Sequence, residues 1–274
     1  MSALGYIKPK QKFAVVARTG RVWVISAING DARRLCALHQ ELEQHLSRGD
    51  SLVYMGNYFG PKPYVLETME ELLGFRHYFL RELGRSEDQL IYLRGQHDEI
   101  WDKLLQIQFM PNPAHVLAWM VENGVGSALQ AYASSAEEAR DFLRRTLVEM
   151  THYTLRLRSN MRVYPGHYEF MSLLRRAAYS EDKKLLFVHC GLDPALNLEA
   201  QEDSFWWGHR NFISIESGYQ SFKHIFAGYN PYVQGCNSYG SVTLLSGGDA
   251  HNRDSNLLAA CVDSNGQILK LLEA

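Results

Sequence analysis

The sequence predicts an α/β fold in which two mixed β-sheets pack together and helices cover their outer faces. Three observations predict it. In the first half, apolar strand-like runs alternate with helical patterns. A mostly helical stretch then spans about 99–180, and strand-like runs return from 183 to the end. Val-, Ile- and Leu-rich runs with little polar alternation are typical of strands buried on both faces. We therefore expect a four-layer αββα sandwich with a helical insertion.

In the first half, strands are predicted at 21–28, 51–56 and 89–95, which gives a βαβαβ order. Between the first two strands, four leucines recur at three- and four-residue spacing and predict an amphipathic helix packed on the core. These leucines are Leu35, Leu38, Leu42 and Leu46.

Within the insertion, Ser135 and Glu138 have the spacing of a capping box, which predicts a helix start. Four strands are expected in the second half, at 183–191, 224–229, 241–247 and 257–263. The Asn265-Gly266 pair between two apolar runs predicts a two-residue hairpin turn near the end of the chain.

Length and composition favour one domain with a large core. The chain has 274 residues, of which 46% are hydrophobic and 21% charged. We expect a single domain over 21–274, preceded by an N-terminal extension over 1–20. No internal repeat or low-complexity linker is visible in the sequence.

Charge and cysteine usage exclude several classes of function. The formal charge of −2 provides no bulk field that would attract nucleic acid. Four widely spaced cysteines form no disulfide-dense or zinc-ribbon pattern, which is typical of a cytoplasmic protein. No apolar run is long enough for a signal peptide or a membrane span, so neither is expected.

Five loops at strand ends carry the residues of chemical interest. Because the carboxyl ends of parallel strands meet at one edge of a sheet, we expect these loops to form one site there. They are SAINGD (26–31), MGNYFGP (55–61), LRGQHDE (93–99), FVHCGLDP (187–194) and FAGYNP (226–231).

In order and spacing, these loops resemble those of the calcineurin-like metallophosphoesterases. The similar group contains the bacterial serine/threonine phosphatases and the symmetrical diadenosine tetraphosphatases, whose loops read D-x-H-G, G-D-x-x-D-R-G, G-N-H-[ED], V-H-[AG]-G-L and G-H-T-P. Segments 117–133 and 164–194 also resemble that group, so the likeness runs from about residue 21 to the C-terminus. It implies a phosphoesterase fold whose members hold two divalent ions, such as Mn, Fe or Zn, at this edge.

The metal-binding positions of the family are altered in this chain. Ala27 stands where the resemblance implies the first Asp, and Asn29 where it implies the first His. Asn57 replaces the bridging carboxylate, Gln96 replaces the Asn ligand, and Tyr229 replaces the last His. The family pattern is therefore degenerate in four of the five loops.

Of the six implied ligands only His189 remains, and the segment 59–63 lacks the second Asp and the phosphate-binding Arg of the family. Two dications ~3.5–4 Å apart repel each other by roughly 19 kcal/mol at an effective dielectric constant of about 20. Anionic ligands must offset that repulsion, and neutral amides bridge hard cations poorly. We therefore predict no two-metal centre and no cofactor, with at most one weakly bound metal.

His97 matches the family's general-acid histidine, but the Asp that would orient it is missing. It is a candidate for vestigial acid catalysis, while His97 and Asp98 can equally be a helix-starting pair, since Asp is favourable near a helix N-terminus. Arg94 has no assigned role. Likewise, His189 can be a structural, hydrogen-bonded side chain at a strand end.

Other candidates lie further along the chain. Arg210 lies near the family's phosphate-binding Arg, although the spacing differs and Gly208 can occupy that place. Trp206 and Trp207 are expected to pack in the protein. Asp249 and His251 can coordinate a metal together, but a turn or surface role is favoured.

Three functions remain open. The first is a catalytically impaired or inactive pseudophosphatase that binds a protein partner, or a phosphate or nucleotide, at the old substrate face. The second is an active phosphoesterase with a rebuilt single-metal or metal-free site, and the third is a structural subunit that makes its contacts through the helices at 111–180. The candidate ligand-binding residues are Asn29, Asn57, Gln96, Asp98, His189, Arg210, Tyr229 and Asn230.

Overall fold

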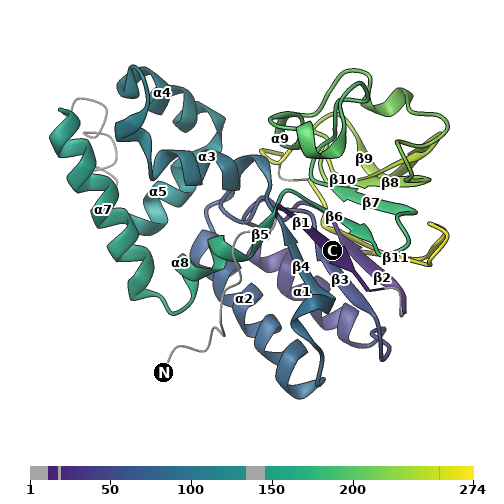
Figure 1. Cartoon of the computed structure of the whole chain (residues 1–274). Coiled ribbons are helices and arrows are strands. Elements are labelled where there is room, and N and C mark those ends of the chain that lie inside the picture. The colour runs from purple at the N-terminus through teal and green to yellow at the C-terminus, as the bar shows by residue number, and fades with distance from the viewer. Residues whose placement is uncertain (1–11, 18–19, 134–145, 253) are drawn as a thin grey trace.

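The fold was determined from a computed structural model that describes residues 12–17, 20–133, 146–252 and 254–274. It contains two mixed six-stranded sheets flanked by helices, as the sequence predicts. Helices of the insertion form one side of the molecule and the sheets form the other (Figure 1). We name each sheet by a central strand, the β2 sheet and the β7 sheet.

The β2 sheet contains the βαβαβ unit. Its strand order is β12-β11-β2-β3-β4-β5, and β2 to β5 run parallel. Its strands are β2 (Val22–Ile25), β3 (Ser51–Tyr54), β4 (Leu90–Leu93), β5 (Leu174–Arg175), β11 (Leu258–Val262) and β12 (Ile268–Glu273). The crossover helices are α1 (Ala32–Glu43) and α2 (Val65–His77), the second continuing into the π-helical turn η1 (Tyr78–Glu82). Leu35, Leu38 and Leu42 of α1 are fully buried, so the predicted apolar stripe is confirmed.

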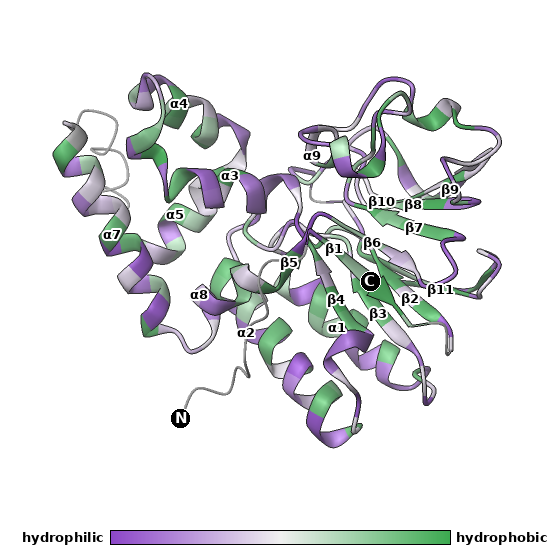
Figure 2. Ribbon diagram, viewed as in Figure 1, coloured by the Kyte–Doolittle hydropathy of each residue, from purple (hydrophilic) through white to green (hydrophobic). Residues whose placement is uncertain are grey.

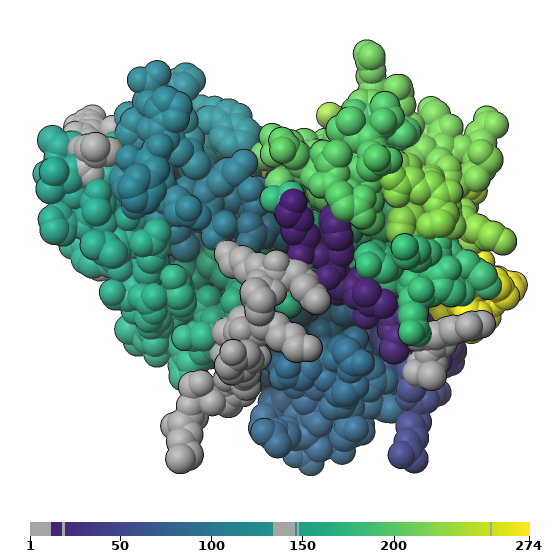
Figure 3. All heavy atoms as spheres, viewed as in Figure 1, coloured from purple at the N-terminus to yellow at the C-terminus, as the bar shows by residue number. Residues whose placement is uncertain are grey.

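The β7 sheet has the order β1-β6-β7-β8-β10-β9. Its strands are β1 (Phe13–Val16), β6 (Ala177–Ser180), β7 (Leu185–Val188), β8 (His224–Ala227), β9 (Gln234–Tyr239) and β10 (Val242–Gly247). β1 pairs in parallel with β6, so part of the segment 1–20 belongs to the folded domain. β1 was not predicted from the sequence, because it joins the sheet by pairing with a strand far along the chain, Phe13 with Ala177. In Figure 3 this purple edge strand lies at the surface.

The insertion is helical over a shorter range than predicted. Its helices are α3 (Gln96–Leu104), η3 (Ile107–Phe109), α4 (Pro113–Met120), η4 (Val121–Val125), α5 (Gly126–Tyr132), α7 (Leu147–Val163), α8 (His167–Phe170) and η6 (Met171–Leu173). The predicted insertion, about 99–180, extends slightly too far, because 174–180 supplies β5 and all of β6. The capping box predicted at Ser135 and Glu138 falls outside the described residues.

Three apolar clusters hold the layers together. One fills the space between the sheets, with Val24, Phe187 and Phe226 among its buried members. A second joins the β2 sheet to the helices, and a third covers the outer face of the β7 sheet. On that outer face lie short turns, including η7 (Leu198–Ala200), α9 (Ser204–Trp207) and η8 (Phe212–Ser214). Figure 2 shows the strands as predominantly hydrophobic, with hydrophilic residues concentrated in loops and on outer helix faces.

The C-terminal hairpin forms, but with a longer loop than the Asn-Gly signal predicts. β11 and β12 pair antiparallel, and Gly266 donates its N–H to the Asp263 carbonyl. Gly266 has φ of +84°, whereas Asn265 is outside the positive-φ region. A two-residue type I′ turn needs positive φ at both central residues, so the turn is a four-residue one that ends in a left-handed glycine. Among the described residues, no helix combines the length and the apolar character needed to cross a bilayer.

Candidate functional site

The five glycine-containing loops meet at one edge, as predicted. They follow the carboxyl ends of β2, β3, β4, β7 and β8, and backbone hydrogen bonds join them. The N–H of Ala27 donates to the carbonyl of Gly228 over 2.8 Å, and the N–H of Ile28 donates to that of Gly56 over 2.9 Å. Backbone hydrogen bonds therefore hold the loops of this edge in fixed positions relative to one another.

Asn29 and Asn57 face each other across two of these loops. Both have positive φ, 57° and 63°, which asparagine adopts more readily than other residues with a side chain. The Nδ2 of Asn57 donates to the Oδ1 of Asn29 over 2.8 Å, and the Oδ1 of Asn57 accepts the N–H of His97 over 3.1 Å. Both side chains are buried. Their principal hydrogen-bonding groups are thus engaged within the protein.

Asp98 fastens the second loop to the third. Its Oδ2 accepts N–H groups from Asn57 and Gly95, and its Oδ1 accepts those of Tyr58 and Phe59, over 2.7–3.1 Å. Burial raises the pKa of this carboxyl to about 6, although the four donors favour its ionised form. Asp98 also caps the start of α3, which agrees with the helix-starting interpretation of this residue. Its carboxylate is saturated by the backbone.

His97 is enclosed by two glycines. A Cβ at Gly60 would overlap the imidazole carbons of His97, and a Cβ at Gly124 would lie 2.6 Å from its Nε2. Gly124 belongs to the π-helical turn η4, so the insertion covers this histidine. Burial lowers the pKa of His97 to about 3, and its Nδ1 is buried without a hydrogen-bond partner. A neutral imidazole in this enclosure is a poor proton donor at neutral pH.

His189 is also buried and neutral. Its Nδ1 donates to the carbonyl of Met55 over 2.5 Å, which places the proton on that nitrogen and leaves Nε2 as an acceptor. Nε2 has no partner. Burial lowers the pKa of His189 to about 4. The ring stacks on Tyr229, with 5.4 Å between centroids, and burial raises the pKa of the tyrosine hydroxyl to about 12.

Apolar packing occupies the position of the implied first Asp. Ala27, Tyr229 and Ala250 form a buried cluster, with Cys190 packed against it. A small apolar residue therefore stands where the resemblance implies a carboxylate.

The remaining predicted residues lie at the periphery of the loop edge. Gln96 is half-buried at the first position of α3. Asn230 uses its Oδ1 to accept the N–H of Tyr232 over 2.9 Å, which closes a local turn. Arg210 is exposed on the loop after α9. Among the described residues, none of these three side chains forms a hydrogen bond or an ion pair with His97 or His189.

Asp249 and His251 form an exposed turn, as the favoured interpretation predicts. The Oδ1 of Asp249 accepts the N–H of His251 over 3.0 Å. Trp206 is buried, and Trp207 packs on Trp119 of α4 with 5.5 Å between ring centroids. Both tryptophans therefore serve in packing, and Trp207 links the β7 sheet to the insertion.

The donor set at the edge does not fit a two-metal centre. Hard divalent ions need several anionic or carbonyl oxygens that converge on one point. Here the edge supplies one alanine, two mutually bonded amides, a saturated carboxylate and an unpaired acceptor nitrogen, the Nε2 of His189. In the ranges that the structure describes, no three His, Cys, Asp or Glu side chains are grouped to hold a metal ion.

Comparisons with known proteins identify the fold. No family model and no curated protein sequence matches the chain. The chain is similar to the crystal structure of a protein assigned as a diadenosine tetraphosphatase, with a TM-score of 0.52 and 16% identity over 96% of this chain and 98% of that one. At this identity the likeness establishes a phosphatase-type fold and no activity.

Two further structures have TM-scores below 0.5. One is a serine/threonine phosphatase from Saccharomyces cerevisiae with similarity to human phosphatase PP5, with a TM-score of 0.49 and 12% identity over 95% of this chain and 82% of that one. The other is a cold-active protein-tyrosine phosphatase of a psychrophilic Shewanella, with a TM-score of 0.43 and 13% identity over 96% and 83%.

Sequence reasoning missed two features of this edge. It considered Asp98 as a helix-starting or ligand-binding residue but did not predict that Asp98 binds the backbone of the 57–59 loop, and it assigned no contact to Gly124. Nothing in the sequence indicated that Gly60 and Gly124, 64 positions apart, enclose the ring of His97.

Proposed function

We propose that this protein is a pseudophosphatase, a phosphatase-like protein that lacks two-metal hydrolysis and binds a partner at the face formed by the strand-end loops. One observation carries the proposal. The side chains of Asn29 and Asn57 hydrogen-bond to each other where the family resemblance implies a metal-binding histidine and a bridging carboxylate. A site closed in this way lacks both the charge and the ligands that would activate a water molecule.

The histidines at the edge support the same proposal. His97 is buried and neutral, so it does not supply the proton that a leaving group needs. The Asp that would orient it is replaced by backbone contacts of the 57–59 loop with Asp98. Loss of the acid function and of the metal ligands together favours binding over turnover.

The direct test combines elemental analysis with an activity assay. The purified chain, incubated with Mn²⁺ and desalted, is expected to hold well under one equivalent of metal. Hydrolysis of p-nitrophenyl phosphate with added Mn²⁺ is expected to equal that of the His97→Ala, His189→Ala double variant. Two bound equivalents with turnover above that control would overturn the proposal.

Four exposed residues make up the binding face that we propose, and we call them the loop face. They extend from loops that follow β7, β8 and β10, all at the same edge of the sheet. The loop face consists of Arg210, Tyr232, Asp249 and His251. Tyr232 is 94% exposed, and aromatic and arginine side chains are enriched at protein-binding surfaces.

Paired surface variants test the partner-binding part. The double variant Tyr232→Ser, Arg210→Ser alters the loop face, whereas Val148→Ser, Leu155→Ser alters exposed apolar positions of α7. In affinity capture followed by mass spectrometry, the loop-face variant is expected to lose partners that the α7 variant retains. The reverse pattern would favour the structural subunit that uses the helices at 111–180.

A phosphate-bearing ligand is the other occupant that we propose for this face. With inorganic phosphate as the probe, calorimetric titration is expected to give the same affinity with Mn²⁺ as with a chelator. An affinity that requires Mn²⁺ would contradict metal-independent binding.

One observation favours a second candidate, a phosphoesterase with a single metal. The buried Nε2 of His189 is an acceptor without a partner, so it is available to one metal ion. One tightly held equivalent of metal, together with phosphatase activity that His189→Ala abolishes, would establish this candidate in place of the first.

A further inference from the structure

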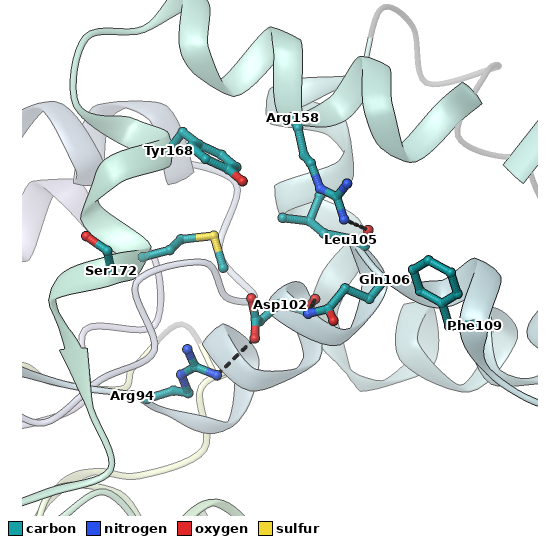
Figure 4. A pocket seen from close by; sticks show the side chains of 9 residues that line it. Arg94, Asp102, Leu105, Gln106, Phe109, Arg158, Tyr168 and Ser172 are labelled. Atoms are coloured by element: carbon teal, nitrogen blue, oxygen red, sulfur yellow. Dashed lines mark hydrogen bonds and ion pairs between the residues drawn. The ribbon is translucent and has the colours of Figure 1, made fainter. Parts of the chain in front are cut away.

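A hollow of about 380 Å³ lies beside α3, and Arg94 of the third strand-end loop is part of its lining. Its lining comes from five segments: the end of β4, α3, η3, α7 and the α8–η6 turn. Figure 4 shows side chains from these segments converging on one space. The volume is within the range of sites that hold small molecules. Its lining shares no residue with the loop face or with the residues around His97.

The charged side chains on the α3 side of the hollow are paired with one another. Arg94 extends from the end of β4, and its Nη1 donates to Oε2 of Glu99 over 2.8 Å and to Oδ2 of Asp102 over 3.0 Å. Lys103 lies 3.4 Å from the other oxygen of Glu99. These two cations and two anions balance, so this side adds little net charge to the hollow.

Arg158 supplies the unbalanced charge. It enters from α7, and its Nη2 donates to the carbonyl of Leu105 at the C-terminus of α3 over 2.5 Å. Among the described residues no carboxylate pairs with it, so the remaining N–H groups of the half-buried guanidinium are available to a ligand. Tyr168 lies on the same side of the hollow in Figure 4, and its phenolic O–H can donate alongside the guanidinium.

Apart from the neutral polar side chains of Gln106 and Ser172, the rest of the lining is apolar. Leu105 and Met171 line its interior, and Phe109 stands at the rim with 81% of its surface exposed. A phenylalanine this exposed gains hydrophobic free energy when a ligand covers its ring. An apolar surface beside one unpaired cation matches an amphiphilic anion.

We propose that this hollow binds a small organic carboxylate with an apolar or aromatic body. The carboxylate accepts N–H groups of Arg158 and the O–H of Tyr168, and the body packs against Met171 and Phe109. The planar guanidinium matches the two oxygens of a carboxylate. A phosphate dianion would bring a second negative charge toward Asp102, whereas an amine would meet Arg158, so a monoanion fits best.

Three probes of similar size and different charge test the proposal: phenylacetate, phenyl phosphate and phenethylamine. Binding to the full chain is measured by calorimetry and by ligand-observed NMR. Phenylacetate is expected to bind with a Kd on the order of 1 mM, as is typical of fragments of this size, and more tightly than the other two. The proposal would be overturned if phenylacetate showed no detectable binding at a concentration of about 20 mM, roughly 20 times the expected Kd. Equal or tighter binding of either other probe would overturn it as well.

Variants locate the site. Arg158→Gln is expected to weaken phenylacetate binding roughly tenfold, the usual effect of losing a charge-assisted hydrogen bond. Arg156→Gln is the matched control, because Arg156 is exposed on the same helix and does not line the hollow. Phe109→Ser is expected to weaken binding several-fold. Because Phe109 is exposed, this variant is expected to fold normally. Unchanged affinity in both Arg158→Gln and Phe109→Ser would show that the probe binds elsewhere and would refute the site.

Discussion

The side chain of Asn57 donates a 2.8 Å hydrogen bond to that of Asn29, and the same Asn57 accepts the backbone N–H of His97. Two asparagines with left-handed backbones thus form part of the frame that joins three loops. Each amide supplies a donor and an acceptor, and a carboxylate supplies acceptors only. The frame is therefore specific for an amide at position 57, which makes a carboxylate at this position costly.

Asn57→Asp is expected to lower the free energy of unfolding by about 1–3 kcal/mol, because it leaves the Oδ1 of Asn29 without a donor and buries a negative charge. Urea unfolding at pH 7.5 in the presence of a chelator measures the change. Asn230→Asp is the control, since the Oδ1 of Asn230 only accepts a hydrogen bond from Tyr232 and an aspartate accepts equally well. Equal stability of Asn57→Asp and the wild type would contradict a structural role for the amide pair.

Asp98→Asn is expected to destabilise the protein more severely. Both oxygens of Asp98 accept two backbone N–H groups each, and the amide would replace one oxygen by an NH₂ group that faces two donors. Two buried N–H groups would lose their acceptor, at a cost of about 2–5 kcal/mol.

The matched control for this prediction is Asp102→Asn, four residues further along α3. The side chain of Asp102 is 27% exposed and its partner Arg94 keeps Glu99, so the expected change is within about 1 kcal/mol. Thermal unfolding of the two variants in parallel makes the comparison. Similar losses in both would mean that loss of negative charge on α3, and not the four N–H donors, accounts for the effect.

The sequence predicted those parts of the fold whose patterns are long and local. The leucine stripe of α1 and the apolar strands β2, β3 and β4 carry the periodicity of their own structure, and the loop order supports the phosphatase-type fold. By contrast, β5 has two residues, and β1, although as long as β2, β3 and β4, joins its sheet by pairing Phe13 with Ala177, far along the chain. Such strands take their structure from pairing with distant neighbours and not from local pattern.

The candidate site was predicted in position but not in its internal contacts. Glycine loops at strand ends located the edge. The burial of His97 beneath Gly60 and Gly124 depends on how the insertion docks, which no local pattern encodes. The hollow at Arg158 was missed for the same reason, since five separate segments line it.

Gly60→Ala is expected to lower the free energy of unfolding by about 3 kcal/mol, because its methyl group would occupy the space of the His97 ring. Adding His97→Ala to Gly60→Ala should restore part of the loss, so a double-mutant cycle would give less than additive destabilisation. Strictly additive effects would contradict the contact.

A glycine in open space serves as the control for this cycle. Gly74 lies in α2 with nothing within 4 Å of an added Cβ. Gly74→Ala should therefore stabilise the protein by about 0.5–1 kcal/mol, since alanine restricts the unfolded chain and favours the helix. Chemical unfolding of the Gly60 and Gly74 variants under the same conditions tests both the predicted loss and the predicted gain in the free energy of unfolding.

The buried neutral state of His189 predicts a pH dependence of stability with a defined sign. Its pKa is about 4 in the folded protein, below the ordinary histidine value of about 6.5. The unfolded chain therefore binds a proton first as the pH falls, so this contribution is complete above pH ~6.5 and is lost as the pH falls through about 4. The loss amounts to about 3 kcal/mol.

His189→Gln removes this contribution, so the stability difference between wild type and variant should shrink by about that amount from pH 7 to pH 4. Asp98 has the opposite dependence, because its raised pKa makes its contribution fall as the pH rises toward about 6. That contribution is common to both proteins and cancels in the difference. Urea unfolding at half-unit pH steps gives the two curves, with His152→Gln on the exposed surface of α7 as the control. If the stability difference between wild type and His189→Gln stayed constant across this range, His189 would take up a proton as readily in the folded protein as in the unfolded chain. Its ring would then be solvated or paired with an acid.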